Sequence, residues 1–121
     1  MAFEKFIIQT KKNFPTASIS TLGRLSLNEA AISAFGLQTK NFAELFYDSE
    51  KALIGIKFLN SETENSLKVQ RRDNSGVFLS VKSFFKAYQI DYSTTYFCEV
   101  SQDEKDKDFL IINLNTKTER R

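Results

Sequence analysis

The apolar and polar positions of this chain change period several times, and the changes predict short strands and two short helices. Between residues 17 and 58 they predict a strand, a tight turn, a short strand, a helix, and two strands joined by a polar turn. Alternation with a period of two indicates the strands, because successive side chains of a strand point to opposite faces. In the last strand, Ile54, Ile56 and Phe58 share one face.

The helix in this segment has sequence signals at both ends. Ser26 lies three residues before Glu29, the spacing of a capping box, so we expect Ser26 to be the N-cap. Gly36 stands where a helix end favours a left-handed residue, and Leu37 is placed to pack on Ile32. The apolar positions at helical spacing are Leu27, Ala31, Ala34 and Phe35.

The same order of elements is predicted again between residues 67 and 114. Alternation over residues 67–72, a turn at residues 73–76 and a return strand at residues 77–79 precede a second helix, for which Ser80 is the expected N-cap. Strands are predicted at residues 96–100 and 109–114. A single shift aligns Gly23 with Gly76 and the apolar positions of the first helix with those of the second. This repetition predicts an internal duplication, 17–58 and 67–114.

These elements predict one α+β domain over residues 1–121. We expect a small, mostly antiparallel β-structure, barrel-like or of the swapped-hairpin type, with two short helices and two similar halves. A first strand is predicted from Phe3 to Gln9. The polar residues 115–121 predict a frayed tail.

Leu22-Gly23-Arg24 before a short strand, and a helix ending in Gly36-Leu37, resemble the AbrB/MazE-type swapped-hairpin family (SpoVT-AbrB-like DNA-binding domains). The likeness covers about a third of the chain. The family has a proline where the helix begins, and this chain has Asn28 near that position. The resemblance implies a DNA-binding regulator built from two interlocked copies. The matching residues are Leu22, Gly23, Arg24, Leu25, Leu27, Phe35, Gly36, Leu37, Phe42, Leu45, Ile54 and Ile56.

The composition excludes several kinds of chemistry. The chain has no histidine, which removes His-based acid–base catalysis, Ser-His-Asp triads and most zinc sites. Cys98 is the single cysteine and lies in an apolar strand pattern, so we expect a buried thiol rather than a nucleophile. The acidic residues between positions 103 and 108 lack the glycine and the final glutamate of a calcium loop, which favours a solvated turn. We expect no enzymatic activity, no cofactor and no metal.

The net charge of +2 allows nucleic-acid binding only where cations gather on one face. Arg24 precedes the short strand, and Arg71 and Arg72 precede the equivalent second turn. In a two-fold arrangement these arginines fall on corresponding edges, and guanidinium groups suit both phosphates and base edges. The expected nucleic-acid-binding residues are Arg24, Arg71, Arg72, Lys11, Lys12 and Lys68.

Two other functions stay open. The first is a protein-interaction or assembly module without a nucleic-acid surface. The second is a single-stranded nucleic-acid-binding protein, which would need exposed aromatic side chains among the cations. Core packing is favoured for the aromatic candidates, which are Phe46, Tyr47, Tyr96 and Phe97.

The leading prediction is a DNA-binding transcriptional regulator or antitoxin-like module that binds double-stranded DNA, with a protein partner as the alternative. We expect it in the cytoplasm and away from membranes, since no stretch approaches transmembrane length. The duplicated halves predict a monomeric pseudo-dimer or a homodimer.

Overall fold

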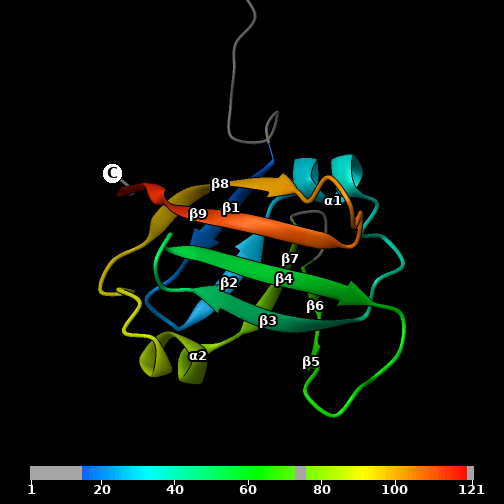
Figure 1. Ribbon diagram of the computed structural model, residues 1–121, viewed down its shortest axis with the longest axis horizontal. Helices are drawn as coiled ribbons and strands as arrows, with labels where there is room; N and C mark the ends of the chain where they lie inside the picture. Colours follow the sequence, from blue (N-terminus) through cyan, green and yellow to red (C-terminus); the bar gives the residue numbers. More distant parts are fainter. Residues whose placement is uncertain (1–14, 73–75, 120–121) are drawn as a thin grey trace, which may run out of the picture.

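The computed structural model describes residues 15–72 and 76–119, which form nine antiparallel strands and two helices (Figure 1). The elements in chain order are β1 (Thr16–Ile19), β2 (Arg24–Leu27), α1 (Glu29–Phe35), β3 (Phe42–Asp48), β4 (Leu53–Leu59), β5 (Leu67–Lys68), β6 (Gln70–Arg72), β7 (Gly76–Ser80), α2 (Lys82–Ala87), β8 (Tyr96–Gln102) and β9 (Phe109–Glu119). The predicted small α+β fold with two short helices is therefore confirmed.

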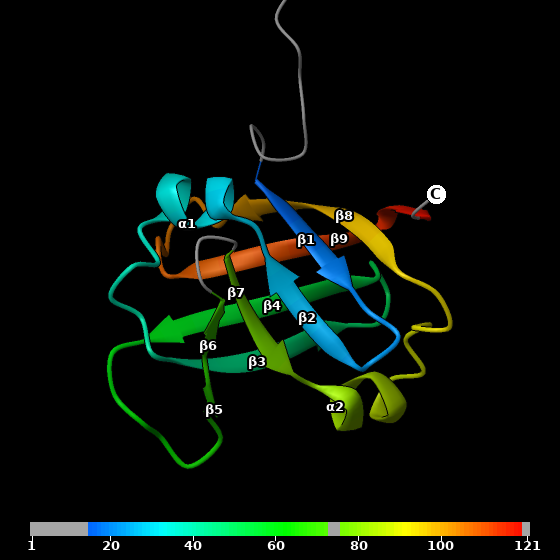
Figure 2. The ribbon, with the colours of Figure 1, turned by 180° about the vertical axis from the view of Figure 1, so that it is seen from behind.

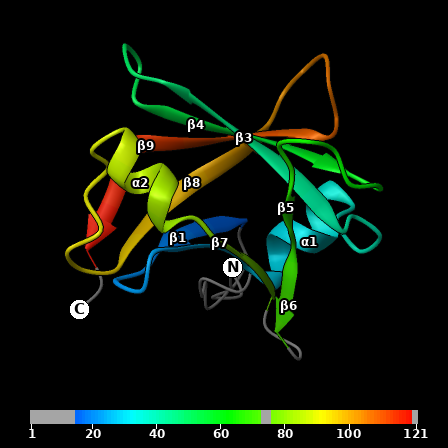
Figure 3. The ribbon, with the colours of Figure 1, turned by 90° about the horizontal axis from the view of Figure 1, so that it is seen from below.

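One sheet contains all of these strands, in the order β5-β3-β4-β9-β8-β1-β2-β7-β6. Val69 alone separates β5 from β6, and its backbone N–H donates to the carbonyl of Asn41 at 2.8 Å. Because β5 pairs with β3 and β6 pairs with β7, this nearly continuous strand brings the two ends of the sheet together. The sheet is thus a nearly closed barrel, as the view from below shows (Figure 3).

The barrel interior is apolar because strand side chains alternate between the two faces of the sheet. Ile54, Ile56 and Phe58 on β4 are fully buried, as the alternation predicted. The helices lie at opposite ends of the barrel (Figures 1 and 2), where α1 buries Ala31 and α2 buries Phe85. No polar or charged residue is buried in the described part of the chain.

The order strand, strand, helix, strand, strand occurs twice, first as β1-β2-α1-β3-β4 and then as β5/β6-β7-α2-β8-β9. The pairing follows the same scheme in each of these two series of elements: β1 with β2 and β6 with β7, then β3 with β4 and β8 with β9. Two further ladders, β2 with β7 and β4 with β9, join each strand to its counterpart. The β1–β8 ladder corresponds in the same way to the β5–β3 ladder.

Two predictions about segment ends differ from the structure or fall outside it. The last strand was predicted to end at residue 114 with a frayed tail after it, whereas β9 continues to Glu119. Residues 114–117 bulge from the β8–β9 ladder. Pairing then resumes at Phe97 with Thr118 and at Tyr96 with Glu119, so the polar end of β9 remains part of the sheet. The strand predicted from Phe3 to Gln9 lies outside the described residues.

The predicted N-caps are both wrong. Ser26 lies within β2, and Asn28 is the N-cap of α1: its Oδ1 accepts hydrogen bonds from the N–H groups of Ala31 and Thr16, each at 3.0 Å. Ser80 is the last residue of β7, and Val81 precedes α2 without a side-chain cap. In both halves the strand continues through the serine, because the alternation of apolar neighbours outweighs the capping preference.

Helix α1 ends at a left-handed glycine, as predicted, and α2 ends in a similar way although it has no glycine there. Gly36 is left-handed, with φ 67° and ψ 43°, and the N–H of Leu37 donates to Ile32 at 3.1 Å. After α2, Gln89 takes a positive φ of 56°, and the N–H of Ile90 reaches back to the carbonyl of Phe85 at 2.8 Å. Both helices therefore end in the same type of reversal.

Replacing Asn28 by alanine should lower the free energy of unfolding by about 1–2 kcal/mol, because it removes the acceptor for the first turn of α1 and for the start of β1. Ser26→Ala is the matched control and should change it by less than about 0.5 kcal/mol, since Ser26 faces outward on β2. Urea denaturation of both variants measures the difference. An equal or larger loss for Ser26→Ala would contradict this assignment of the cap.

Within residues 15–72 and 76–119, no helix has the length and apolar character needed to cross a membrane.

Candidate functional site

The outer surface of the barrel carries a face without carboxylates. We call it the basic face, and it consists of the outward-facing positions of β1, β2, β7, β6 and β5 (Figure 2). Among the residues whose side chains are described, these positions carry only cations, hydroxyls, an amide and one aromatic ring. They are Thr16, Ser18, Arg24, Ser26, Lys68, Gln70, Phe78 and Ser80.

Cross-strand pairing places a row of side chains straight across the basic face and onto the neighbouring strand β8, where Glu99 lies opposite Thr16 and borders the face. Phe97 on β8 lies opposite Ser18, Ser18 opposite Ser26, Ser26 opposite Phe78, and Phe78 opposite Gln70. Directly opposite residues of antiparallel strands point to the same side of the sheet. The row therefore has an aromatic ring near each end and two hydroxyls between them.

Arg24 lies beside this row, at the start of β2. Its guanidinium carbon is 4.6 Å from the centroid of the Phe78 ring, a cation–π contact that holds the planar group against the barrel surface. The carbonyl of Gly23 accepts a hydrogen bond from the N–H of Val81 at 2.8 Å. This bond brings the start of α2, with the exposed Lys82, next to the turn before Arg24.

Arg71 is placed differently from Arg24. It lies opposite Val77, which is buried, so its side chain leaves β6 on the inner side of the sheet. Its Nη2 donates to the carbonyls of Leu37 and Lys40, at 3.2 and 2.6 Å. Arg71 thus binds the loop after α1, and the structure does not bring it together with Arg24.

Of the four other predicted cations, only Lys68 has a side chain within the described part of the structure. Lys68 is exposed on β5, opposite Phe42, and belongs to the basic face. The backbone of Arg72 pairs with Gly76 at the end of β6, but its side chain lies outside the described part of the structure. Lys11 and Lys12 also lie outside the described residues.

The four predicted aromatic residues do not share one environment. Tyr47 and Tyr96 are partly buried and pack against the core. Phe97 is half-buried on the outer side of β8, at one end of the row, and Phe46 is 48 % exposed. The expectation of core packing is therefore wrong for Phe97 and Phe46.

The carboxylates of the acidic loop between β8 and β9 are bound by lysine side chains and by backbone N–H groups of the same loop. Asp106 is hydrogen-bonded to Lys57, and Asp108 forms an ion pair with Lys40 at 3.2 Å. Asp103 accepts hydrogen bonds from the N–H groups of Lys105 and Asp106 at 3.0 and 2.9 Å. These contacts describe a charged hairpin turn, and no cluster of metal-ligating residues occurs among the described residues.

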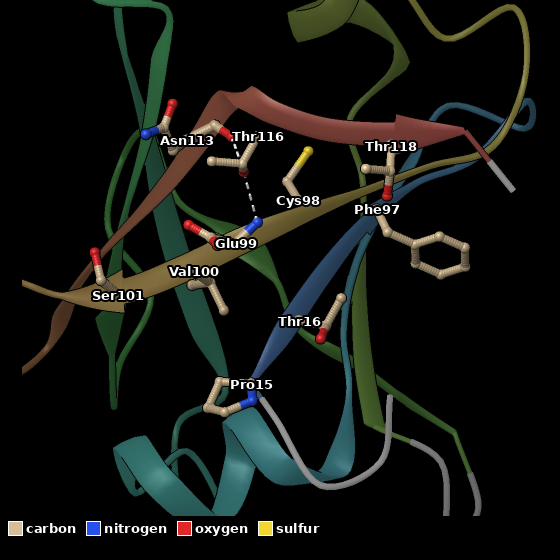
Figure 4. Close-up of a pocket in the computed structure, with 10 residues that line it drawn as sticks. All are labelled: Pro15, Thr16, Phe97, Cys98, Glu99, Val100, Ser101, Asn113, Thr116 and Thr118. Atoms are coloured by element: carbon tan, nitrogen blue, oxygen red, sulfur yellow. Dashed lines mark hydrogen bonds between the residues drawn. The ribbon is translucent and has the colours of Figure 1, made fainter. Parts of the chain in front are cut away.

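A hollow of about 570 Å³ lies where the β8–β9 ladder bulges (Figure 4). The hydroxyl of Thr116 bridges the bulge by donating to the carbonyl of Asn113 at 2.6 Å and accepting from the N–H of Glu99 at 2.9 Å. Cys98 lines the hollow, but it is 3 % exposed and burial raises the pKa of its thiol to about 11. The thiol stays protonated at neutral pH, as expected of a structural cysteine.

The chain matches no protein-family model, no curated protein and no solved structure.

Sequence reasoning identified Arg24 and Lys68 but missed the residues that give the basic face its character, namely Phe78, Ser18, Ser26 and Lys82. The strand alternation contained part of this signal, because it places Ser26 and Phe78 on the outer face of the sheet, away from the core. What alternation does not provide is the register between strands distant in sequence, which puts Phe78 under Arg24.

Proposed function

We propose that this protein is a cytoplasmic, non-catalytic DNA-binding regulator or antitoxin-like module that contacts duplex DNA through the basic face. The observation that carries the proposal is a sheet face without carboxylates, on which Arg24 is fixed over Phe78. Arg24, Lys68 and Lys82 would contact phosphates, and the serine hydroxyls would donate hydrogen bonds to phosphate oxygens. The cation–π contact orients the guanidinium before binding, which lowers the entropy lost on forming the complex.

We further propose that the chain is a single-chain pseudo-dimer of the swapped-hairpin type, formed by duplication. Three features support this: the repeated order of elements, the corresponding ladders, and an exchange of contacts between the halves. The turn glycine of the first half, Gly23, lies against Lys82 at the start of α2, and Gly76 of the second half lies against Asn28 at the start of α1. The resemblance of the Leu22-Gly23-Arg24 segment to the AbrB/MazE-type family fits this architecture.

Single-stranded DNA is a second candidate ligand, favoured by the row on the basic face. Phe78 and Phe97 point outward from strands three ladder steps apart, which is roughly 14 Å at the usual strand spacing. Aromatic rings on a cationic sheet face stack with unpaired bases, whereas duplex DNA presents phosphates first. A comparison of duplex and single strand of the same sequence separates these ligands.

Arg24→Ala should weaken binding of a mixed-sequence duplex and reduce the log–log salt slope by about one, because one phosphate contact is lost. Fluorescence anisotropy over a range of potassium chloride concentrations measures both quantities. Arg24→Lys should keep the slope and still weaken binding, since the ammonium group lacks the planar contact with Phe78.

Lys105→Ala is the matched control, because Lys105 is an exposed cation in the β8–β9 loop, away from the basic face. Its slope and affinity should equal those of the unsubstituted protein. Equal weakening by Lys105→Ala would show that only net charge matters. Failure of both duplex and single strand to bind at low salt would exclude the proposed function.

A further inference from the structure

An apolar patch lies on the side of the barrel formed by β3, β4, β9 and β8 (Figure 1). We call it the β4–β9 patch, and it consists of outward-facing residues, where sheet proteins normally place polar side chains. The most exposed member is Phe46, and the others are half-buried or covered by a neighbouring ring. The patch comprises Phe46, Leu53, Gly55, Phe109 and Ile111.

The register of three strands sets the shape of the patch. Gly55 lies opposite Phe46 on one side and Ile111 on the other. A Cβ at Gly55 would be 2.4 Å from Cζ of Phe109, which means that the Phe109 ring lies directly over the glycine. The rings of Phe46 and Phe109 are 5.6 Å apart and inclined at 45°, and they border a hollow of about 270 Å³. The hollow is large enough for one aliphatic or aromatic side chain.

Carboxylates surround the patch. Glu44 and Asp48 precede and follow Phe46 on the outer side of β3. Glu99 faces outward on β8, opposite Asn113 of β9 and Thr16 of β1, one outward position along β8 from Ser101, which lies opposite Ile111 at the end of the patch. Two cations lie near the patch. Lys57 lies opposite both Glu44 and Phe109, and Asp106 binds its ammonium group. Lys51 is exposed in the turn between β3 and β4, two residues before Leu53.

We propose that the β4–β9 patch binds a segment of a partner protein in which an aliphatic or aromatic side chain is flanked by lysine or arginine. The apolar side chain would enter the hollow beside Phe46, and the flanking cations would meet Glu44, Asp48 and Glu99. Buried apolar anchors supply most of the affinity of such interfaces, and charge complementarity selects the partner.

The same carboxylates argue against other occupants. A patch-to-patch contact with a second copy of this chain would bring Glu44, Asp48 and Glu99 close to the same carboxylates of that copy, and like charges in an interface are unfavourable. An anionic lipid surface would be repelled for the same reason. A basic segment is the occupant that the charges of this face complement.

This inference is independent of the proposed function. The basic face lies on β1, β2, β7, β6 and β5, with β1, β2 and β7 on the other side of the barrel (Figures 1 and 2), and Glu99, opposite Thr16, is the residue of this proposal that borders it. A protein with these two surfaces would link a basic partner segment to nucleic acid.

The test is a titration of the full-length, ¹⁵N-labelled protein with a synthetic peptide in which phenylalanine and leucine alternate with lysine and arginine. Chemical-shift changes are expected on β3, β4 and β9. Phe46→Ser should weaken binding at least tenfold, and Glu44→Gln combined with Glu99→Gln should weaken it and reduce its salt dependence. Leu22→Ser is the matched control, because Leu22 is 69 % exposed in the β1–β2 turn, and it should bind as the unsubstituted protein does.

Four outcomes would overturn the proposal. The first two are the absence of chemical-shift changes at millimolar peptide, and equal binding of a peptide that has glutamate at every cationic position. The other two are a dimer in sedimentation that Phe46→Ser dissociates, and binding to anionic vesicles that Phe46→Ser abolishes. The last two would assign the patch to a second copy or to a lipid surface. Oligonucleotide binding should be unchanged in Phe46→Ser, and peptide binding unchanged in Arg24→Ala, so each proposal can fail alone.

Discussion

Replacing Phe85 by alanine should lower the free energy of unfolding by about 3–5 kcal/mol, the range for a fully buried phenylalanine. Phe85 has no exposed surface and is one of the largest fully buried side chains. It reaches from α2 into one end of the barrel, where its ring lies 5.5 Å from that of Tyr92. Since α2 is short, the cavity cannot close by a shift of the helix without disturbing the strands it covers. Denaturation by urea or guanidinium measures the loss.

Tyr88→Ala is the appropriate comparison for this variant. Tyr88 follows α2, is 49 % exposed, and contacts the rings of Tyr47 and Phe84 at 4.8 and 5.1 Å. Its removal should cost only about 0.5–1.5 kcal/mol, because solvent already covers half of it. A loss for Phe85→Ala no greater than that for Tyr88→Ala would mean that α2 does not close the barrel as described.

The period of the apolar residues was enough to predict most elements of the fold. The strands were predicted within a few residues, with two exceptions: β5 and β6 were expected as one alternating segment over residues 67–72, and β9 continues through a polar sequence after Leu114. The buried faces were predicted with equal success, because alternation leaves a strand only one way to bury Ile54, Ile56 and Phe58. The N-caps were predicted wrongly, since Ser26 satisfies a capping spacing and a strand alternation at once.

The candidate site could be predicted only in part, because it depends on contacts between strands that are far apart in the sequence. Alternation already separated Arg71, which follows Leu67 and Val69 on one face, from Lys68 and Gln70 on the other. The bonds of Arg71 to the carbonyls of Leu37 and Lys40 depend on the closure of the barrel, which no local pattern reveals.

The exposure of Phe46 was not predicted, although the alternation along β3 contains the signal. Aromatic residues in strands are usually buried, but Phe46 shares its face of the strand with Glu44 and Asp48. Its position follows from Ala43, Leu45 and Tyr47, which take the inner face of β3 and leave Phe46 on the outer face. Gly55 on the neighbouring strand then leaves room for the Phe109 ring, so that two aromatic residues meet on the surface.

Gly76→Ala should destabilise the protein by about 3 kcal/mol or more, through strain and overlap together. Gly76 has a φ of 113°, which an alanine adopts only with strain. A Cβ there would lie 2.1 Å from the carbonyl oxygen of Leu27 and 3.2 Å from Cα of Asn28. Both contacts are with backbone, so no side chain can move aside. Relief would require β7 to separate from the end of β2 and from the start of α1.

Gly36→Ala separates the two causes, because Gly36 also has a positive φ but its Cβ would meet nothing within 4 Å. This control should cost about 1 kcal/mol, the strain alone. The larger loss at Gly76 would then measure how closely the start of β7 packs against the start of α1.

If residues 17–58 and 67–114 were two separately folding units, Gly76→Ala would unfold the second segment at lower denaturant than the first. Because β2 pairs with β7 and β4 with β9, we expect one cooperative transition for every variant, with α1 and α2 lost together. Circular dichroism and the fluorescence of the four tyrosines, followed in the same titration, would show whether the two halves unfold as one.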